Sequence, residues 1–191
     1  MIKRIADDVW KIKVRFLEAN VYLVDIDVPT LVDLGYYPDM KIILKDLESI
    51  GYSANDIKRV IFTHLHADHS GDPSCFANAR FFASYNEIKN VKSLGMLFTY
   101  DSEATDKLSK AKLEPLKDKI GPFEVIPAPG HTSGSVCFYL RETGLLFTGD
   151  TLFGKHFGRT DVPTGSDKDL NKSLERLSKI KAKLLPGHDY G

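Results

Sequence analysis

The sequence predicts an α/β domain in which mixed β-sheets and helices form layers. Short segments of alternating β-branched and aromatic residues occupy the first third, and helical patterns then alternate with further strand-like segments. These elements do not form one long strand–helix–strand series, which favours mixed rather than purely parallel sheets. A chain of 191 residues, 42% of them apolar and 27% charged, is consistent with one domain spanning residues 1–191.

The N-terminal third predicts three strands followed by a helix. The strand segments are VWKIKVRF (9–16), NVYLVDI (20–26) and PTLVDLG (29–35). Residues 38–50 predict a helix that begins at Pro38 and ends at Gly51. Its apolar residues recur at helical spacing, and they are Met40, Ile43, Leu44, Leu47 and Ile50. The apolar run RVIFT (59–63) is typical of a strand buried on both faces.

Residues 86–119 differ from their surroundings, because they are rich in Lys, Glu and Ser and mostly helical in pattern. Gly95 and Pro115 interrupt this pattern. We expect a charged helical insertion at about 86–119 that covers part of the domain. Its apolar run LGMLFTY (94–100) either lines the entrance of the site, forms a dimer contact or packs on its own domain, and the last is favoured.

The C-terminal part predicts three strands and one helix. FEVIPAPG (123–130) predicts a strand that ends in a loop, and SVCFYLRETGLLFTGD (135–150) predicts a hairpin that turns at residues 142–144. Ser166 is an N-cap residue for a final helix, whose apolar face is expected to contain Leu170, Leu174, Leu177 and Ile180. KLLPG (183–187) predicts a last strand, directly before His188.

Charge and cysteine content bound the expected partners. Lys+Arg and Asp+Glu both number 26, so we expect no binding to nucleic acid. No apolar leader or spanning stretch is evident, so we expect no membrane partner. Cys75 and Cys137 form neither a CxxC pair nor a disulfide framework, which favours a cytoplasmic location. The expected partner is a small-molecule substrate, and the expected assembly is a monomer or homodimer.

The segment Thr63-His64-Leu65-His66-Ala67-Asp68-His69 places four potential metal ligands within six residues. Imidazole nitrogens and carboxylate oxygens suit zinc, and also iron or manganese. In an extended backbone His64 and His66 point the same way and reach one ion. Asp68 and His69 follow as the chain turns into a helix, a position suited to a second ion. The alternative, a polar loop with surface histidines, is disfavoured directly after a buried strand.

Four ligands do not fill two coordination shells, so further ligands are expected downstream. The candidates are His131 in PAPGHTSG, Asp150 in LLFTGDTLF and His188 in KLLPGHDY. Each follows an apolar strand beside a glycine, which lets the backbone approach a crowded site closely. A loop role is the alternative for any one of them alone. Together with the first cluster they provide five histidines and two aspartates.

A count of charges indicates catalysis rather than a structural metal site. Two divalent ions bring four positive charges, and two aspartates with one bridging hydroxide remove three. The remaining positive charge can hold water as hydroxide, polarise a carbonyl and stabilise an oxyanion. Structural metal sites are usually closed and rich in cysteine. We therefore expect two divalent metal ions as cofactors, zinc first and iron or manganese as alternatives, with Asp68 and Asp150 as candidate catalytic residues.

The motifs THLHADH, GHTSG, GDTLF and PGHDY, in this order, resemble the successive metal-site motifs of the metallo-β-lactamase superfamily. They are most similar to its compact glyoxalase II-like (hydroxyacylglutathione hydrolase-like) branch, and the resemblance runs from about Leu31 to Gly191. It implies a four-layer αβ/βα sandwich with two mixed sheets, helices on the outer faces and the metal site at one edge of the sheets.

The resemblance also implies a role for each candidate ligand. It assigns the first ion to His64, His66 and His131. It assigns the second ion to Asp68, His69 and His188, with Asp150 bridging the two ions. Asp33, in TLVDLG, matches an early aspartate of the family that usually orients a ligand, although a turn role at a strand end explains it equally well.

The resemblance says less about the substrate. Glyoxalase II proper carries a helical C-terminal extension and a Lys/Tyr segment after GDTLF that contact the glutathione thioester. Here the sequence ends three residues after His188 and has GKHFGRTDVPTGS in that place, like the compact members. Lys155 and Arg159 are candidate substrate contacts near Asp150. Arg159 suits a substrate carboxylate, but a salt bridge with Asp161 explains it at least as well, and His156 is expected at the surface.

We therefore predict a binuclear metal-dependent hydrolase that cleaves a thioester or related activated acyl compound by attack of a metal-bridging hydroxide. A lactone or β-lactam would follow the same steps. An alternative of another class is a persulfide dioxygenase with one iron on His64, His131 and Asp150. Its branch shares the HxHADH and GRTD signatures, but KHFGRTD lacks the Gly-Cys usual before Gly-Arg. A nuclease or phosphodiesterase is disfavoured by the zero net charge, and a binding module without chemistry is disfavoured most.

Overall fold

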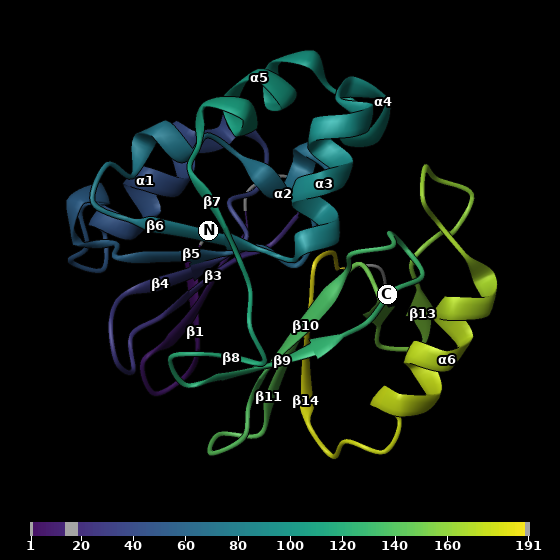
Figure 1. Cartoon of the computed structure of the whole chain (residues 1–191). Helices are drawn as coiled ribbons and strands as arrows, with labels where there is room; N and C mark the ends of the chain where they lie inside the picture. Colours follow the sequence, from purple (N-terminus) through teal and green to yellow (C-terminus); the bar gives the residue numbers. More distant parts are fainter. Residues whose placement is uncertain (1, 14–18, 190–191) are drawn as a thin grey trace.

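The computed structural model, which describes residues 2–13 and 19–189, has four layers: two β-sheets packed face to face and helices outside both (Figure 1). The predicted αβ/βα sandwich with two mixed sheets is thereby confirmed. The first sheet has the strand order β1-β2-β3-β4-β5-β6-β7, and the second has the order β14-β11-β10-β9-β8. Residues 14–16 of the predicted strand 9–16 lie outside the described residues.

The first sheet is antiparallel from β1 to β4 and parallel from β4 to β7. Its strands are β1 (Ile2–Ala6), β2 (Val9–Ile12), β3 (Val21–Val24), β4 (Thr30–Val32), β5 (Arg59–Ile61), β6 (Arg80–Ala83) and β7 (Leu113–Pro115).

In the second sheet β14 runs parallel to β11, and the other neighbours are antiparallel. Its strands are β8 (Lys119–Ile120), β9 (Phe123–Pro127), β10 (Val136–Leu140), β11 (Leu145–Gly149) and β14 (Lys183–Pro186). A separate hairpin is formed by β12 (Leu152–Phe153) and β13 (His156–Phe157).

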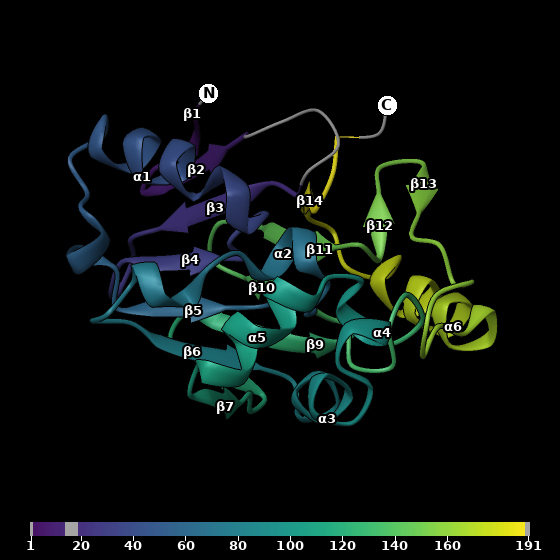
Figure 2. The same cartoon turned by 90° about the horizontal axis from the view of Figure 1, so that it is seen from above.

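Helices α1 to α5 lie over the first sheet and α6 lies against the second, as Figures 1 and 2 show. The α-helices are α1 (Met40–Glu48), α2 (Ala67–Ser70), α3 (Tyr85–Leu94), α4 (Met96–Thr99), α5 (Ser102–Lys110) and α6 (Asp167–Leu177). Short 3-10 turns are η1 (Tyr37–Asp39), η2 (Ala54–Asp56) and η3 (Pro73–Cys75). None of the described helices is long and apolar enough to cross a membrane.

Three apolar clusters fill the three interfaces between the four layers. Strand β10 shows how alternation divides one strand between two of them. Phe138 packs with Tyr22 and Phe82 of the first sheet, whereas the adjacent Cys137 and Tyr139 pack with Leu177 of α6. A third cluster joins α1, α3 and α5 to the other face of the first sheet. A sheet buried on both faces explains why β10 is buried along its whole length and why Val60 and Ile61 of β5 are both buried and apolar.

Most predicted elements appear close to their expected positions. The helix predicted over 38–50 forms as η1 and α1, and the predicted turn at residues 142–144 connects β10 to β11. Ser166 caps α6, where its hydroxyl accepts a hydrogen bond from the amide of Asp169 at 3.2 Å. Strand β1 is not among the predicted elements; its sequence IKRIA has two adjacent charged residues and is only half-buried at the sheet edge.

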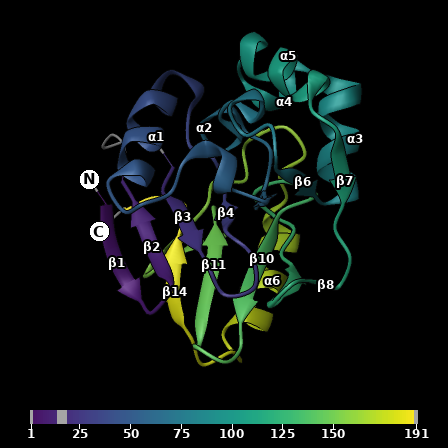
Figure 3. The ribbon, with the colours of Figure 1, turned by 90° about the vertical axis from the view of Figure 1, so that its left-hand side faces the viewer.

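The segment at 86–119 contains α3, α4 and α5, as its helical pattern indicates, and it also supplies β7 and the start of β8. Strand β7 pairs with β6 in the first sheet and β8 pairs with β9 in the second. The chain therefore passes from one sheet to the other along one side of the molecule (Figure 3).

Packing between the two sheets should dominate stability. Phe138 is fully buried there, with its ring centroid 6.1 Å from that of Phe123. Phe138→Ala should lower the free energy of unfolding by about 3–5 kcal/mol, measured by urea denaturation. Ile42→Ala, at a position 38% exposed on α1, is the control and should change it by about 0.5 kcal/mol or less. Equal effects in the two variants would contradict this account of the core.

Candidate metal centre

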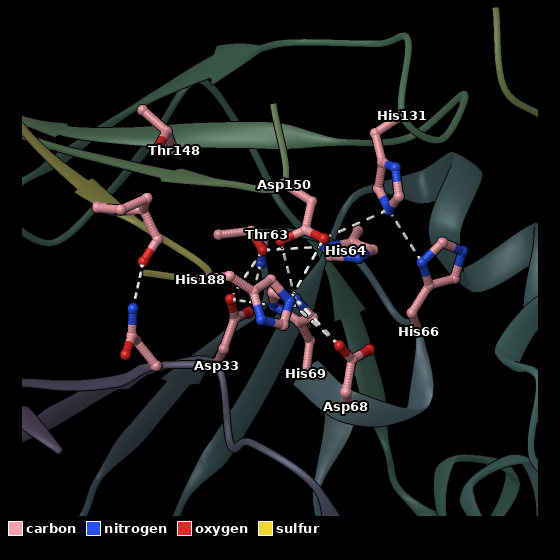
Figure 4. A network of polar contacts seen from close by, with 12 residues as sticks. Asp33, Thr63, His64, His66, Asp68, His69, His131, Thr148, Asp150 and His188 are labelled. Atoms are coloured by element: carbon pink, nitrogen blue, oxygen red, sulfur yellow. Dashed lines mark hydrogen bonds and ion pairs between the residues drawn. The ribbon is translucent and has the colours of Figure 1, made fainter. Parts of the chain in front are cut away.

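The predicted metal ligands gather at one edge of the sandwich, where strands from both sheets end. His64 follows β5 of the first sheet, whereas Asp150 and His188 follow β11 and β14 of the second. His131 comes from the loop between β9 and β10. Figure 4 shows these side chains converging from separate elements on one small volume.

The cluster after β5 divides as expected between an extended segment and a helix. His66 has an extended backbone and precedes α2, whereas Asp68 and His69 lie within that helix. The turn brings His69 back toward the end of β4. There the carbonyl of His69 accepts a hydrogen bond from the amide of Leu34 at 2.8 Å. Gly71 ends the helix in a left-handed conformation with φ of +50°.

Among the groups of three potential ligand atoms, two share no residue. In each group the atoms lie within 4.8 Å of one another, and the groups are His64, His66 and His131, and Asp68, His69 and His188. These are the two ligand sets that the motif resemblance implies. A third group, His64, His69 and Asp150, shares one histidine with each of these two, so Asp150 lies between them.

Several distances within the groups fit the coordination of a metal ion, although Asp68 Oδ2 is 3.9 Å from His69 Nε2. Ligand atoms about 2.0–2.1 Å from one ion lie about 2.9–3.6 Å apart at angles of 90–120°. His66 Nδ1 is 3.0 Å from His131 Nε2, and His69 Nε2 is 3.3 Å from His188 Nε2. Asp68 Oδ2 is 3.2 Å from His188 Nε2. Asp150 reaches toward both sets, with Oδ1 3.1 Å from His69 Nε2 and Oδ2 3.8 Å from His131 Nε2.

Asp33 orients two of the histidines. Its carboxylate accepts hydrogen bonds from the amide and hydroxyl of Thr63, both at 2.8 Å, and lies 2.9 Å from His69 Nδ1. Because the Thr63 hydroxyl donates to Asp33, its oxygen can accept from His64 Nδ1, 3.2 Å away. Both imidazoles therefore direct Nε2 at the centre, and the buried Nε2 of His64 has no hydrogen-bond partner among the described residues.

His131 is oriented by the backbone of the loop that follows β13. Its Nδ1 lies 2.8 Å from the carbonyl oxygen of Arg159 and must donate there, because a carbonyl only accepts. Its Nε2 then faces the first ligand set, 3.0 Å from His66 Nδ1. His66 packs on the rings of Phe98 and Tyr100, with centroids 5.4 and 5.3 Å away.

Burial keeps two histidines of the first ligand set, His64 and His66, in the form that binds metal. Burial and neighbouring imidazoles hold the pKa of His64 well below its usual range. The same causes lower the pKa of His66 to about 3. Both rings are therefore neutral at physiological pH, so they can act as ligands without losing a proton.

The second set is more strongly charged. Burial alone would lower the pKa of His188, but hydrogen bonds with Asp150 and Asp68 outweigh it and raise the pKa to about 9. The pKa of His69 is also raised, against its burial, by the carboxylates of Asp150, Asp68 and Asp33. Burial alone would raise the pKa of Asp150, but His69 and His188 hold it well below the usual range.

The donor set therefore fits divalent metal ions. It combines the neutral imidazoles of His64 and His66, ionised carboxylates, a buried His64 Nε2 without a hydrogen-bond partner among the described residues, and ligand spacings of a coordination polyhedron. Gly187 has no side chain and therefore leaves space for ligands that lie this close together. A Cβ on Gly187 would lie 2.4 Å from Asp150 Oδ1 and 2.7 Å from His69 Cε1.

Some residues that hold the site have no motif signal in the sequence. Tyr22 and Asn20 donate hydrogen bonds to the carbonyl of Pro186, at 2.7 and 3.0 Å, and so anchor the loop of His188. Glu87 is fully buried between the loops of His66 and His131. An acid in the first turn of a charged helix is ordinarily solvated, so neither its burial nor its contacts could be predicted.

Two cavities border the centre and contain the candidate substrate contacts. One, of about 440 Å³, is lined by His131, Asp150, Phe157 and Arg159 among others. The other, of about 610 Å³, is lined by His188 and Lys155 among others. Arg159 forms a bidentate salt bridge with Asp161 at 2.7 and 2.8 Å, the alternative that the sequence left open. His156 is exposed, as expected.

The apolar run 94–100 packs on its own domain and also borders the site. Phe98 and Thr99 are buried, whereas Met96, Leu97 and Tyr100 are exposed by 54–68% of their surface. Tyr100 has a left-handed backbone with φ of +65°, an unusual conformation for a bulky residue, and its ring contacts that of His66.

An αβ/βα sandwich with a cluster of histidines and aspartates at the strand ends defines a class of metal-dependent enzymes. The chain belongs to the metallo-β-lactamase superfamily, whose family model matches residues 14–188. It is similar to a probable metallo-hydrolase of Methanocaldococcus jannaschii, with 31% identity over 189 residues, covering 89% of this chain and 87% of that one.

Two further proteins are similar over most of this chain. The hydroxyacylglutathione hydrolase of Rhodospirillum rubrum is 31% identical over 153 residues, which is 78% of this chain and 53% of that protein. The chain thus spans about half the length of that relative. The crystal structure of TTHA1623 in a di-iron-bound form aligns with a TM-score of 0.75 and 25% identity, covering 93% of this chain and 91% of that chain.

Binding of the second ion should depend on pH. His188 must lose its proton to bind metal, and a pKa of about 9 keeps it protonated at pH 7 in the metal-free protein. In the His66→Ala variant, which keeps only the second set complete, the zinc dissociation constant should fall at least about tenfold per pH unit between pH 6 and 8. Calorimetry in buffers of different ionisation enthalpy counts the released protons.

His188→Ala is the matched control, because it keeps only the first set, whose histidines His64 and His66 are neutral at these pH values. Its dependence on pH should be clearly shallower. Equal slopes in the two variants would contradict the assigned difference in charge between the sets.

Proposed function

We propose that the protein is a binuclear metal-dependent hydrolase that cleaves a thioester or a related activated acyl compound. The observation that carries this proposal is the pair of ligand sets with Asp150 between them, beside two open cavities. Structural metal sites are usually closed and have no cavities beside their ligands. The relatives named hydroxyacylglutathione hydrolase support a thioester, although the match spans about half of such a protein.

Divalent ions bound here would supply a hydroxide nucleophile near neutral pH and polarise the acyl carbonyl. The residues of the chain would bind the ions and orient the attacking water. Asp150 and Asp68 remain ionised, because His69 and His188 together outweigh the effect of burial and keep the pKa of each carboxyl below its usual range. The side chain of Asp68 is 38% exposed, so it can accept a hydrogen bond from the attacking water and orient it.

The two cavities match the two halves of such a substrate. On the His131 side, Phe157 is 61% exposed, and Tyr100 borders the same ligand set with 57% exposure. An apolar acyl group would bury these rings. On the His188 side Lys155 places a cation beside the cavity, which suits a carboxylate of the leaving thiol.

Metal content and activity test the reaction class. The purified protein should bind two divalent ions and hydrolyse a thioester such as lactoylglutathione or a simple acyl thioester, and a chelator should abolish the activity. His66→Ala should bind one ion and lose at least about a hundredfold in kcat, while its circular dichroism remains that of the folded protein.

The same measurements separate the alternatives. One iron per chain with oxygen uptake on glutathione persulfide would replace the hydrolase with a dioxygenase. Hydrolysis of a lactone without thioester cleavage would keep the reaction class but change the substrate. Full activity in His66→Ala would refute the assignment of the metal centre.

A substitution at the cavity rim tests the placement of the acyl group. Phe157→Asp should lower kcat/KM for a hexanoyl thioester about tenfold more than for the acetyl thioester of the same thiol, because burial of each methylene contributes about 0.8 kcal/mol. Ile42→Asp, an exposed apolar position on α1, is the matched control and should leave the ratio unchanged. An unchanged hexanoyl-to-acetyl ratio in Phe157→Asp would place the acyl group elsewhere.

A further inference from the structure

Glu87 is a buried acid that the proposed reaction does not use, and its contacts lie on two ligand-bearing loops. It stands in the first turn of α3 and is 0% exposed. The cap residue Ser84 accepts a hydrogen bond from the Glu87 amide at 3.2 Å and donates to the carbonyl of Gly134 at 2.6 Å. The N-terminus of α3 is therefore fastened to the loop that carries His131.

The two carboxylate oxygens of Glu87 hold different loops. Oε2 accepts a hydrogen bond from the amide of Leu65 at 2.7 Å, and Leu65 stands between His64 and His66. Oε1 accepts a hydrogen bond from the hydroxyl of Thr132 at 2.7 Å, and Thr132 follows His131. Each contact is one residue from a member of the first ligand set.

The backbone leaves room for this carboxylate. A Cβ on Gly134 would lie 2.6 Å from Glu87 Oε1, so a side chain there would displace the acid. Asn86 and Asn90, on the same helix, donate hydrogen bonds to the carbonyl and hydroxyl of Ser133 at 3.2 and 3.0 Å. Two turns of α3 thus hold a loop of a few residues beside His131.

If Glu87 had a purely structural role, burying a neutral side chain in its place would cost less free energy than burying a carboxylate. Burial raises the pKa of Glu87 to about 7, against hydrogen bonds from Thr132, Leu65 and Gly134. Among the described residues, no Lys or Arg forms an ion pair with it. A carboxylate nevertheless accepts at both oxygens, which lets one side chain fix two loops at once.

We propose that Glu87 is the positioning residue of the first ligand set: it fixes the spacing between the His64–His66 segment and the His131 loop, so that three imidazoles meet one ion. Asp33 does the corresponding work for the second set through its contact with His69. The proposal rests on the metal centre of the proposed function but not on its substrate. Its test measures metal binding and can succeed or fail independently of thioesterase activity.

The test compares the two ions separately. In the His188→Ala background only the first set is complete, and in the His66→Ala background only the second. Glu87→Leu, which removes both acceptors and keeps a similar volume, should raise the zinc dissociation constant at least tenfold in the first background and less than twofold in the second. Competition with a chromophoric chelator gives both constants.

A conservative variant and a matched control accompany this test. Glu87→Gln keeps one acceptor for the Leu65 amide and should restore most of the affinity of the first set. Thr30→Val is the matched control, because Thr30 is also fully buried and its hydroxyl donates to the carbonyl of Val28 at 2.8 Å, far in sequence from both ligand loops. It should lower the unfolding midpoint but leave both dissociation constants unchanged.

Should Glu87→Leu fail to fold, Thr132→Val removes only one of the two ties and should raise the dissociation constant of the first set by a smaller factor. An equal loss at both sets would reduce Glu87 to a structural residue. Unchanged affinity of the first set in Glu87→Leu or Thr132→Val would refute the proposal.

Discussion

The carboxylate of Asp33 is the group on which the geometry of the metal centre depends. It accepts hydrogen bonds from the amide and hydroxyl of Thr63 and contacts His69 Nδ1, all within 2.9 Å. Through the Thr63 hydroxyl it also determines which nitrogen of His64 faces the centre. Asp33 has a left-handed backbone with φ of +58°, a conformation that a short polar residue tolerates better than a bulky one. The end of β4 thus stores a small strain where it orients ligands of both sets.

The sheet edge that carries the metal centre also connects the two sheets to each other. Each ligand set takes residues from both halves of the sandwich: His64 with His131, and His69 with His188. Backbone bonds cross at the same place, since the amide of Val136 donates to the carbonyl of Thr63 at 2.9 Å. An ion bound to either set therefore ties the sheets together, and its binding free energy adds to the stability of the fold.

Sequence alone could predict what local spacing encodes. The density of His and Asp after β5, and the recurrence of His or Asp beside glycine at later strand ends, are sufficient to single out the side chains that the fold brings together. The hairpin between β10 and β11 and the cap of α6 also follow from local rules. Long-range contacts could not be predicted from local spacing. Glu87 resembles any other charge on a solvated helix, because nothing within its own turn records that two distant loops close over it. Strands β7 and β8 escape prediction for the same reason, since two or three residues acquire strand geometry only from their neighbours.

The distribution of charge explains why the two ligand sets are built differently. In the metal-free protein the carboxylates of Asp150 and Asp68 raise the pKa of both His69 and His188, and Asp33 also raises that of His69. Protons there balance a charge that a divalent ion would otherwise neutralise. Within the described part of the chain the first set has no comparable excess of carboxylates, and burial keeps His64 and His66 neutral. Its geometry cannot be maintained by ion pairs between ligands, so it must be imposed from outside by hydrogen bonds such as those that link His131 to Arg159 and Glu87 to the two loops. Electrostatic attraction thus assembles one half of the centre, and rigid hydrogen-bonded loops assemble the other.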